Sequence, residues 1–285
     1  MAYEGERAMF EAYAKNKYTS TGVIQWMMDN AWPSTIWHLY DYYLQPAGGY
    51  FGTKKACEPL HIQYSYDDRS VVVVNGYPEP HKGLHATVAV LDANLKNIFD
   101  HETTVDIDAD ATKSVVAIPD FPDTPAVYFV KLTLTDANNR TVSSNFYWLP
   151  SKISTLDWNK TPDSAWTPIA TFEDLTALQQ LQKATVKGSA QRRGNSVLIK
   201  VHNPSDKLAF LVKLSLRDAA TKNELLPILW DDNYVSLLPG ESREIDASYL
   251  LQTKLPARMV LNIDGWNTES VEVPVQLGVK EGAHE

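Results

Sequence analysis

The sequence predicts a mainly β fold in which two β-sandwiches follow a short helix–strand–helix unit. Two patterns carry this prediction. From residue 61 onward, short runs that alternate apolar and polar residues are separated by turn signals rich in Asp, Asn and Gly. The first 60 residues instead alternate helix-like and strand-like segments, as α/β units do. The chain of 285 residues is 44% hydrophobic and 21% charged, which suffices for the cores of about two domains.

The N-terminal unit begins with a predicted helix over residues 3–17, whose apolar and charged side chains separate onto two faces. Residues 21–27 are mostly apolar and suit a buried strand of a parallel sheet. A long aromatic loop follows, and a second short helix is expected at 51–57 because Pro59 stops it. A unit of this size cannot cover both faces of its own sheet, so further elements are expected around it.

Residues 61–150 are predicted to form the first sandwich. Strands are expected at Ile62–Tyr66, Ser70–Asn75, His85–Leu91, Ile98–Val105, Ser114–Ile118, Val127–Thr135 and Thr141–Trp148. About seven short antiparallel strands in about 90 residues are typical of a β-sandwich. In the sixth strand the apolar residues change face between Phe129 and Leu132, which predicts a β-bulge.

Residues 151–183 are predicted to form a linker with a short helix. The linker is indicated by Pro162 and Pro168 among many Ser and Thr residues, and the helix is expected at Thr171–Lys183. Residues 184–285 are predicted to form the second sandwich. Its strands are expected at Thr185–Ala190, Ser196–His202, Phe210–Arg217, Glu224–Trp230, Tyr234–Leu237, Ser242–Ile245, Arg258–Ile263 and Ser270–Val275.

Charge and composition exclude several classes of partner. The net charge is −9 with no basic stripe, which argues against a nucleic-acid partner. No apolar run approaches the roughly 18 residues of a membrane span. The first residues have neither the basic nor the apolar region of a signal peptide, so none is predicted, and the localisation stays unknown. Cys57 is the only cysteine; this excludes an internal disulfide, and the thiol is expected to be buried.

One loop is unusually rich in aromatic residues. These residues are Trp26, Trp32, Trp37, Tyr40, Tyr42, Tyr43, Tyr50 and Phe51. Such a loop is either a small core that packs one domain on another or a sugar site, because sugars favour flat aromatic walls with a few polar partners. The sequence leaves both interpretations open. His38 and Asp41 have a metal-like spacing but no further ligand nearby, so no metal site is predicted. The chain has no phosphate-binding glycine loop, and no cofactor is predicted.

Several long blocks resemble family 2 glycoside hydrolases. They are Tyr3–Tyr13, Gly22–Ser34, Trp37–Leu44, Gly49–His61, Trp230–Tyr234 and Leu238–Ser242. The blocks are most similar to the branch that holds exo-β-glucosaminidases and β-mannosidases. In this family a (β/α)8 barrel is followed by immunoglobulin-like domains.

The resemblance implies a domain assignment and a set of substrate-binding residues. Residues 1–60 would be the C-terminal piece of a TIM-barrel catalytic domain, namely the last helix–strand–helix of an incomplete (β/α)8 barrel. The two sandwiches would be immunoglobulin-like. Trp26 would end barrel strand eight, at the face where active sites of such barrels lie. It would form the aromatic floor of a sugar subsite, with Asp29, Asn30 and Trp32 in the adjoining loop.

The resemblance also implies that catalytic residues lie outside this chain. Retaining glycosidases need two carboxyl groups about 5 Å apart. In the family these are glutamates on strands four and seven, upstream of the first helix here. Glu4, Glu6 and Glu11 do not match the motifs of those strands. No catalytic residue is assigned, and the chain is expected to be inactive alone.

Three hypotheses follow from the sequence. The first is that the chain is part of a retaining exo-β-glycosidase acting on β-linked glucosamine or mannose. In that case its ligand is an oligosaccharide or glycoside, and a second chain or self-association would complete the barrel. The parent enzyme would be periplasmic or secreted. The second is a non-catalytic carbohydrate-binding module, and the third is a structural β-sandwich protein. The choice between glucosamine and mannose stays open.

Overall fold

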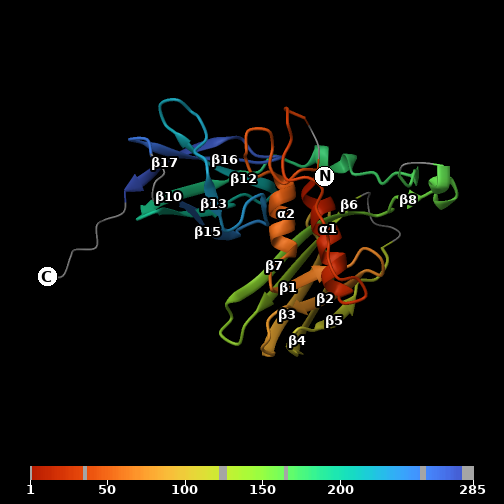
Figure 1. Ribbon diagram of the computed structural model, residues 1–285. Coiled ribbons are helices and arrows are strands. Elements are labelled where there is room, and N and C mark those ends of the chain that lie inside the picture. The colour runs from red at the N-terminus through yellow and green to blue at the C-terminus, as the bar shows by residue number, and fades with distance from the viewer. Residues whose placement is uncertain (1, 35–36, 122–126, 164–165, 251–254, 278–285) are drawn as a thin grey trace. The chain divides into compact units, whose positions relative to one another are not determined.

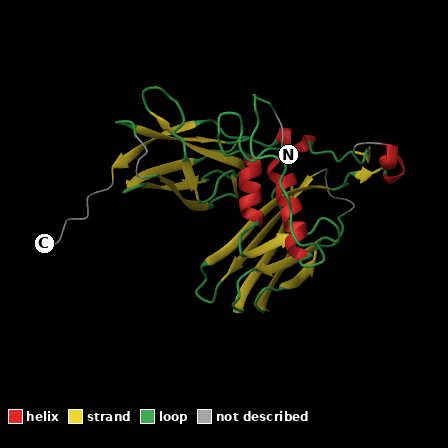
Figure 2. Cartoon of the chain, in the orientation of Figure 1, coloured by secondary structure: helices red, strands yellow, loops and turns green. Residues whose placement is uncertain are grey.

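The chain divides into two compact units that are each dominated by strands (Figure 2). The computed structural model describes residues 2–34, 37–121, 127–163, 166–250 and 255–277. The first-sandwich unit comprises Gly5–Ile24 and Thr53–Leu181, and the second-sandwich unit comprises Met1–Glu4, Gln25–Gly52 and Gln182–Glu285. The mainly β fold class is confirmed (Figure 1). Residues of the N-terminal 60 belong partly to each unit.

Both predicted helices form, with slightly different ends. Helix α1 spans Ala2–Lys15 and helix α2 spans Gly48–Ala56. An acidic residue in the first turn of α1 and a lysine in its last turn complement the helix dipole. Cys57 follows the last residue of α2 and is exposed, so the prediction of a buried thiol is wrong. The helix buries Ala56 instead, which places the next side chain on the solvent side.

The strand predicted at residues 21–27 does not form. Its backbone is irregular, and Trp26 and Met27 are exposed. A parallel strand needs a neighbour for its backbone hydrogen bonds, and no strand of the described residues pairs with this run. The helix–strand–helix remnant of a barrel is therefore not confirmed.

The first sandwich contains all seven predicted strands. They are β1 (Leu60–Tyr64), β2 (Ser70–Asn75), β3 (His81–Asp92), β4 (Asn97–Ile107), β5 (Thr112–Ala117), β6 (Val127–Thr135) and β7 (Thr141–Pro150). One sheet has the order β1-β2-β5 and the other the order β4-β3-β6-β7. Every neighbouring pair is antiparallel. Ile62, Val73, Val88 and Leu132 contribute to the apolar core of the sandwich.

No bulge lies between Phe129 and Leu132 of β6, where one was predicted; the pairing of β6 with β7 shifts only between Leu134 and Thr135. The pairing of β6 with β3 runs without a shift from Tyr128 to Thr135. Tyr128, Val130 and Leu132 face the core with a regular period of two. Phe129 is buried on the opposite face, where its ring stacks on Phe146 with the ring centroids 5.4 Å apart. The apparent change of face reflects burial of the strand on both sides rather than an extra residue.

The segment between the sandwiches contains short elements and no α-helix in its described part. It holds strand β8 (Thr155–Leu156), 3₁₀ helix η1 (Trp158–Asp163), strand β9 (Ile169–Thr171) and 3₁₀ helix η2 (Thr176–Gln180). A short helix therefore does lie within the predicted range Thr171–Lys183, but it is a 3₁₀ helix and is shorter than predicted. Its apolar residues recur every three positions, which matches a 3₁₀ helix with three residues per turn better than an α-helix. Leu178 is its one buried residue.

The second sandwich contains all eight predicted strands. They are β10 (Lys187–Arg193), β11 (Ser196–His202), β12 (Ala209–Asp218), β13 (Ile228–Trp230), β14 (Val235–Leu237), β15 (Ser242–Tyr249), β16 (Met259–Asp264) and β17 (Val271–Leu277). Their order is β13-β15-β11-β10-β17-β16-β12-β14, with a parallel β10–β17 pair. Side chains from all eight strands pack into one core, so the sheet curls back over itself. Asn233 ties the Trp230–Tyr234 loop to β12 by accepting a hydrogen bond from the Leu214 amide and donating one to its carbonyl.

Gly52 provides a test of how closely the two helices approach each other. A Cβ atom at this position of α2 would overlap the carbonyl of Tyr3 in α1, whereas a Cβ at Gly5 would meet nothing within 4 Å. We expect Gly52→Ala to lower the free energy of unfolding by about 1–3 kcal/mol. Gly5→Ala should raise it by about 0.5–1 kcal/mol. Urea unfolding followed by circular dichroism measures both, and a Gly52→Ala protein as stable as the parent would contradict this close approach.

Candidate functional site

The four predicted substrate-binding residues lie in an exposed, irregular loop. The side chains of Trp26 and Trp32 are 72% and 65% exposed. The indole N–H of Trp37 donates a hydrogen bond of 2.8 Å to the carbonyl of Trp26, which brings these two tryptophans together. Asn30 bonds locally, to the Ser34 hydroxyl and the Ala31 amide. No hydrogen bond links the side chain of Asp29 to the rest of the described chain.

The C-terminal part of the same loop is anchored to the second sandwich. Three ring contacts, with centroids 5.3, 5.1 and 5.7 Å apart, run from Tyr40 through Tyr50 and Phe51 to Tyr234. Phe51 is 2% exposed and belongs to the core of the second sandwich. The Asp41 carboxylate accepts hydrogen bonds from the backbone amides of the two residues Tyr43 and Gln45. This part of the aromatic cluster serves packing.

The two interpretations of the aromatic loop therefore apply to different residues. Tyr40, Tyr50 and Phe51 pack toward the second sandwich, while other large apolar side chains of the loop are exposed. The exposed ones are Trp26, Met27, Met28, Trp32, Trp37, Tyr42, Tyr43 and Leu44. We call this set the aromatic patch. Exposed apolar side chains gathered in one segment make the aromatic patch a candidate interaction site.

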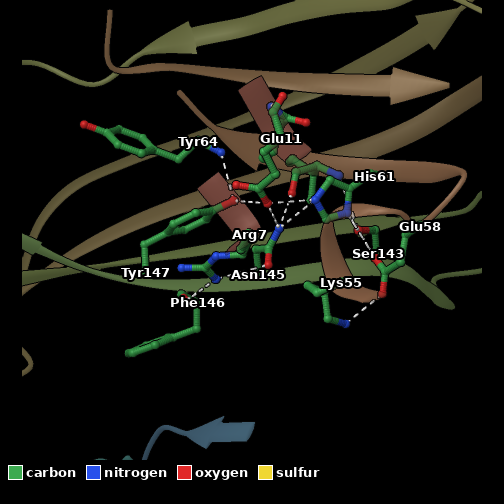
Figure 3. A network of polar contacts seen from close by, with 12 residues as sticks. Arg7, Glu11, Lys55, Glu58, His61, Tyr64, Ser143, Asn145, Phe146 and Tyr147 are labelled. Carbon is green, nitrogen blue, oxygen red and sulfur yellow. Dashed lines mark hydrogen bonds and ion pairs between the residues drawn. The ribbon is translucent and has the colours of Figure 1, made fainter. Parts of the chain in front are cut away.

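A second cluster of functional groups is buried beneath α1 in the first-sandwich unit (Figure 3). One carboxylate oxygen of Glu11 accepts hydrogen bonds from the His61 ring at 2.9 Å and from the Tyr147 hydroxyl at 2.8 Å. The Asn145 amide donates a third, at 3.2 Å. Glu11 is 1% exposed and His61 is fully buried. Helix α1 is thereby joined through one carboxylate to strands β1 and β7.

The other nitrogen of His61 faces a second carboxylate. Its Nδ1 lies 3.1 Å from Glu58, which also bonds the Lys55 ammonium at 2.7 Å and the Ser143 hydroxyl at 2.9 Å. Burial disfavours the imidazolium, but the hydrogen bonds to Glu11 and Glu58 outweigh it and raise the pKa of His61. Burial would also raise the pKa of Glu58, yet His61 and Lys55 together lower it to about 2. The carboxyl groups on both sides of the ring therefore favour the imidazolium form of His61.

Arg7 adds a second buried cation on the same helix face. Its Nη1 donates a hydrogen bond of 2.8 Å to the carbonyl of Phe146. Its guanidinium carbon lies 3.9 Å from the centroid of the Tyr147 ring, within the range of a cation–π interaction. The side chain is fully buried. We call Arg7, Glu11, Glu58, His61, Asn145 and Tyr147 the buried network.

The buried network resembles a catalytic triad in composition but cannot act as one. Ser143, His61 and Glu11 follow one another in the order of a nucleophile, base and orienting acid. The Ser143 hydroxyl donates to Glu58 at 2.9 Å and lies 3.4 Å from His61. The hydroxyl thus donates to Glu58 rather than to His61, and Ser143 is 3% exposed, so no substrate can reach it. The network therefore has a structural role.

Two family models match the chain. One is described as the exo-β-D-glucosaminidase Ig-fold domain and matches residues 164–268. The other is described as the mannosidase Ig/CBM-like domain and matches residues 67–151. No group of three or more His, Cys, Asp or Glu in the described ranges could hold a metal ion, and no described helix could cross a membrane.

Curated relatives and solved structures agree with these matches. The exo-β-D-glucosaminidase of Amycolatopsis orientalis is 36% identical over 286 residues, which cover 95% of this chain and 27% of that protein. The mannosylglycoprotein endo-β-mannosidase of Lilium longiflorum is 25% identical, over 93% of this chain and 33% of that protein. The exo-chitosanase of Amycolatopsis orientalis, solved with PNP-β-D-glucosamine, is 35% identical with a TM-score of 0.89, over 96% of this chain and 34% of that one.

The two sandwiches thus match immunoglobulin-like domains of the C-terminal part of family 2 glycoside hydrolases. The chain is homologous to that part of the exo-β-D-glucosaminidases and of a β-mannosidase. It spans 27% of the length of its Amycolatopsis relative. The predicted family and the immunoglobulin-like sandwiches are confirmed.

Removing the charge of Glu11 tests whether the buried network holds α1 in place. Glu11→Gln keeps the shape but leaves the imidazolium with one anion, so we expect the free energy of unfolding to fall by about 3–5 kcal/mol. Glu244→Gln is the matched control, because Glu244 pairs with Lys200 at the surface and should be nearly neutral. Urea unfolding measures both, and equal effects of the two substitutions would contradict the proposed role.

The same network predicts a pH dependence of stability. The pKa of His61 is raised in the folded state. Its contribution to the free energy of unfolding is therefore complete below pH 6.5, the ordinary pKa, and is lost as pH rises through the raised pKa. The pKa of Glu58 is lowered to about 2, so its contribution is full above the ordinary value of 4.5 and is lost as pH falls. We expect the urea midpoint to be highest between these two ordinary values. In His61→Gln the decline at the alkaline side should disappear; an unchanged decline would contradict this assignment.

Proposed function

We propose that this chain supplies one wall of the sugar-binding site, and the accessory sandwiches, of a retaining exo-β-glycosidase. The substrate is an oligosaccharide or glycoside with β-linked glucosamine or mannose at its end. The observation that carries the proposal is the aromatic patch, where Trp26, Trp32 and Trp37 expose their rings beside polar groups. Sugars bind in such places because their apolar C–H faces stack on indole rings.

The four predicted substrate-binding residues have distinct roles in this proposal. Trp26 stacks on the terminal sugar ring, and Trp32 flanks it. The carboxylate of Asp29 and the amide of Asn30 bond hydroxyl or amine groups at the rim. Because the relatives with the higher identity are exo-β-D-glucosaminidases, glucosamine is the first sugar to test.

The acid and the nucleophile of the reaction come from a barrel that this chain helps to complete. Glu6 and Glu11 are 4% and 1% exposed, so neither can reach a sugar. The catalytic carboxylates are therefore assigned to residues equivalent to the upstream part of the relatives. This part is carried by the same polypeptide or by a second chain. Covering the aromatic patch with it also removes apolar surface from water.

A fusion tests this proposal. The upstream portion of the Amycolatopsis enzyme is joined to this chain, and hydrolysis of PNP-β-D-glucosamine is followed by release of the chromophore. We expect turnover by the fusion and none by the chain alone. Trp26→Ala should lower kcat/KM at least about tenfold, since the ring stacks on the sugar.

Trp158→Ala is the matched control, because Trp158 is 68% exposed but lies outside the aromatic loop. It should leave kcat/KM unchanged. Turnover by the isolated chain would refute the assignment of the carboxylates to another segment. If the fusion folds and is active but its kcat/KM is unchanged by Trp26→Ala, the proposal that Trp26 forms a wall of the sugar site is refuted.

A further inference from the structure

The first sandwich carries a groove that shares no residue with the aromatic patch. Its volume is about 720 Å³, within the range of small-ligand sites. It lies among the start of β1, the loop between β2 and β3, and the end of the β6–β7 hairpin. Leu60 and Leu84 are buried at its base, and the half-exposed Val142 forms one side.

An aromatic side chain projects from a rigid loop at one end of this groove. Tyr77 is 41% exposed, and its ring centroid lies 5.5 Å from that of His81, another lining residue. The loop is fixed by the fully buried Asn75, whose amide oxygen accepts from the Tyr77 amide at 2.9 Å. The Asn75 amide nitrogen donates to the carbonyl of Glu79 at 2.8 Å. These bonds fix the backbone that carries the Tyr77 ring at the end of the groove.

The charged groups that line the groove are acidic. Glu58, Glu79 and Asp136 contribute carboxylates, and no lysine or arginine is among the lining residues. Glu58 is paired with Lys55, and Asp136 with Arg140 at 2.8 Å. The exposed carboxylate of Glu79 has no partner in the described part of the chain. A ligand with an apolar face and a positive charge matches this lining.

We propose that this groove is a second, non-catalytic site that binds a β-linked glucosamine oligosaccharide through a protonated amino sugar. The inference rests on the proposed function and deepens it, because it selects glucosamine over mannose. The sugar ring stacks on Tyr77 and covers the leucine floor, while its ammonium group bonds Glu79. Residues 67–151 match a family model described as a mannosidase Ig/CBM-like domain, which supports a carbohydrate as the ligand.

Binding of a glucosamine tetrasaccharide to the whole chain tests the proposal. Calorimetry is carried out at mildly acidic pH, where the amines are protonated, and the fully N-acetylated tetrasaccharide serves as the neutral probe. We expect Tyr77→Ala and Glu79→Gln each to weaken binding about tenfold. Glu102→Gln removes an exposed carboxylate from β4 outside the groove and should leave the affinity unchanged. Amide shifts in nuclear magnetic resonance spectra should cluster at residues 77–81.

Several outcomes would overturn the proposal. Equal affinity for the N-acetylated sugar would exclude recognition of the amine, and equal binding of a lysine tetrapeptide would exclude recognition of the sugar. Indifference to both groove substitutions would place binding elsewhere. If Trp26→Ala abolishes all binding, the sugar binds at the aromatic patch. This result would refute a binding site in the groove but support the proposed function. Binding in the groove together with an inactive fusion would instead support the second site and refute the proposal that the aromatic patch forms a wall of the catalytic sugar site.

Discussion

The ion pair between Glu11 and His61 is the interaction on which the first-sandwich unit depends. It joins a helix to a sheet with no water access, because both partners are at most 1% exposed. A buried charge is tolerated only when paired and hydrogen-bonded, and here Glu11 accepts three hydrogen bonds while His61 faces a carboxylate on each side. Helix α1 is therefore fixed in one position on the sandwich.

The loop after α1 shows how the same sequence serves two purposes. Tyr40, Tyr50 and Phe51 pack toward the second sandwich, and their contacts hold the C-terminal half of the loop. The N-terminal half is tied to Tyr40 by a hydrogen bond from the Tyr40 amide to the carbonyl of Met28, and it exposes Trp26 and Trp32. A soluble domain gains nothing from exposed indole rings, since each leaves apolar surface in water. Their exposure has a physical reason if a sugar and the remainder of a barrel cover them.

The sandwiches could be predicted from the sequence because their signals are local. Period-two runs and Asp or Asn turns determine the strands, and all fifteen appear within a few residues of the expected positions. The buried network could not be predicted, because its partners are far apart in the sequence. Glu11 is 50 residues from His61 and 136 residues from Tyr147. The prediction of a strand at residues 21–27 was wrong for a related reason. An apolar run forms a strand only when a neighbouring strand pairs with it, and that neighbour cannot be seen in the local sequence. The bulge predicted between Phe129 and Leu132 was wrong because β6 is buried on both faces, so that apolar residues occur on both faces without an extra residue.

In the proposed function, the aromatic patch binds the sugar, and catalysis depends on a barrel completed by another segment. A crystal structure of the fusion with bound glucosamine tests this most directly. The account predicts that carbon atoms of the sugar lie within about 4–4.5 Å of the Trp26 indole, the distance of van der Waals contact. A glucosamine seated in the barrel with Trp26 turned away into solvent would contradict it.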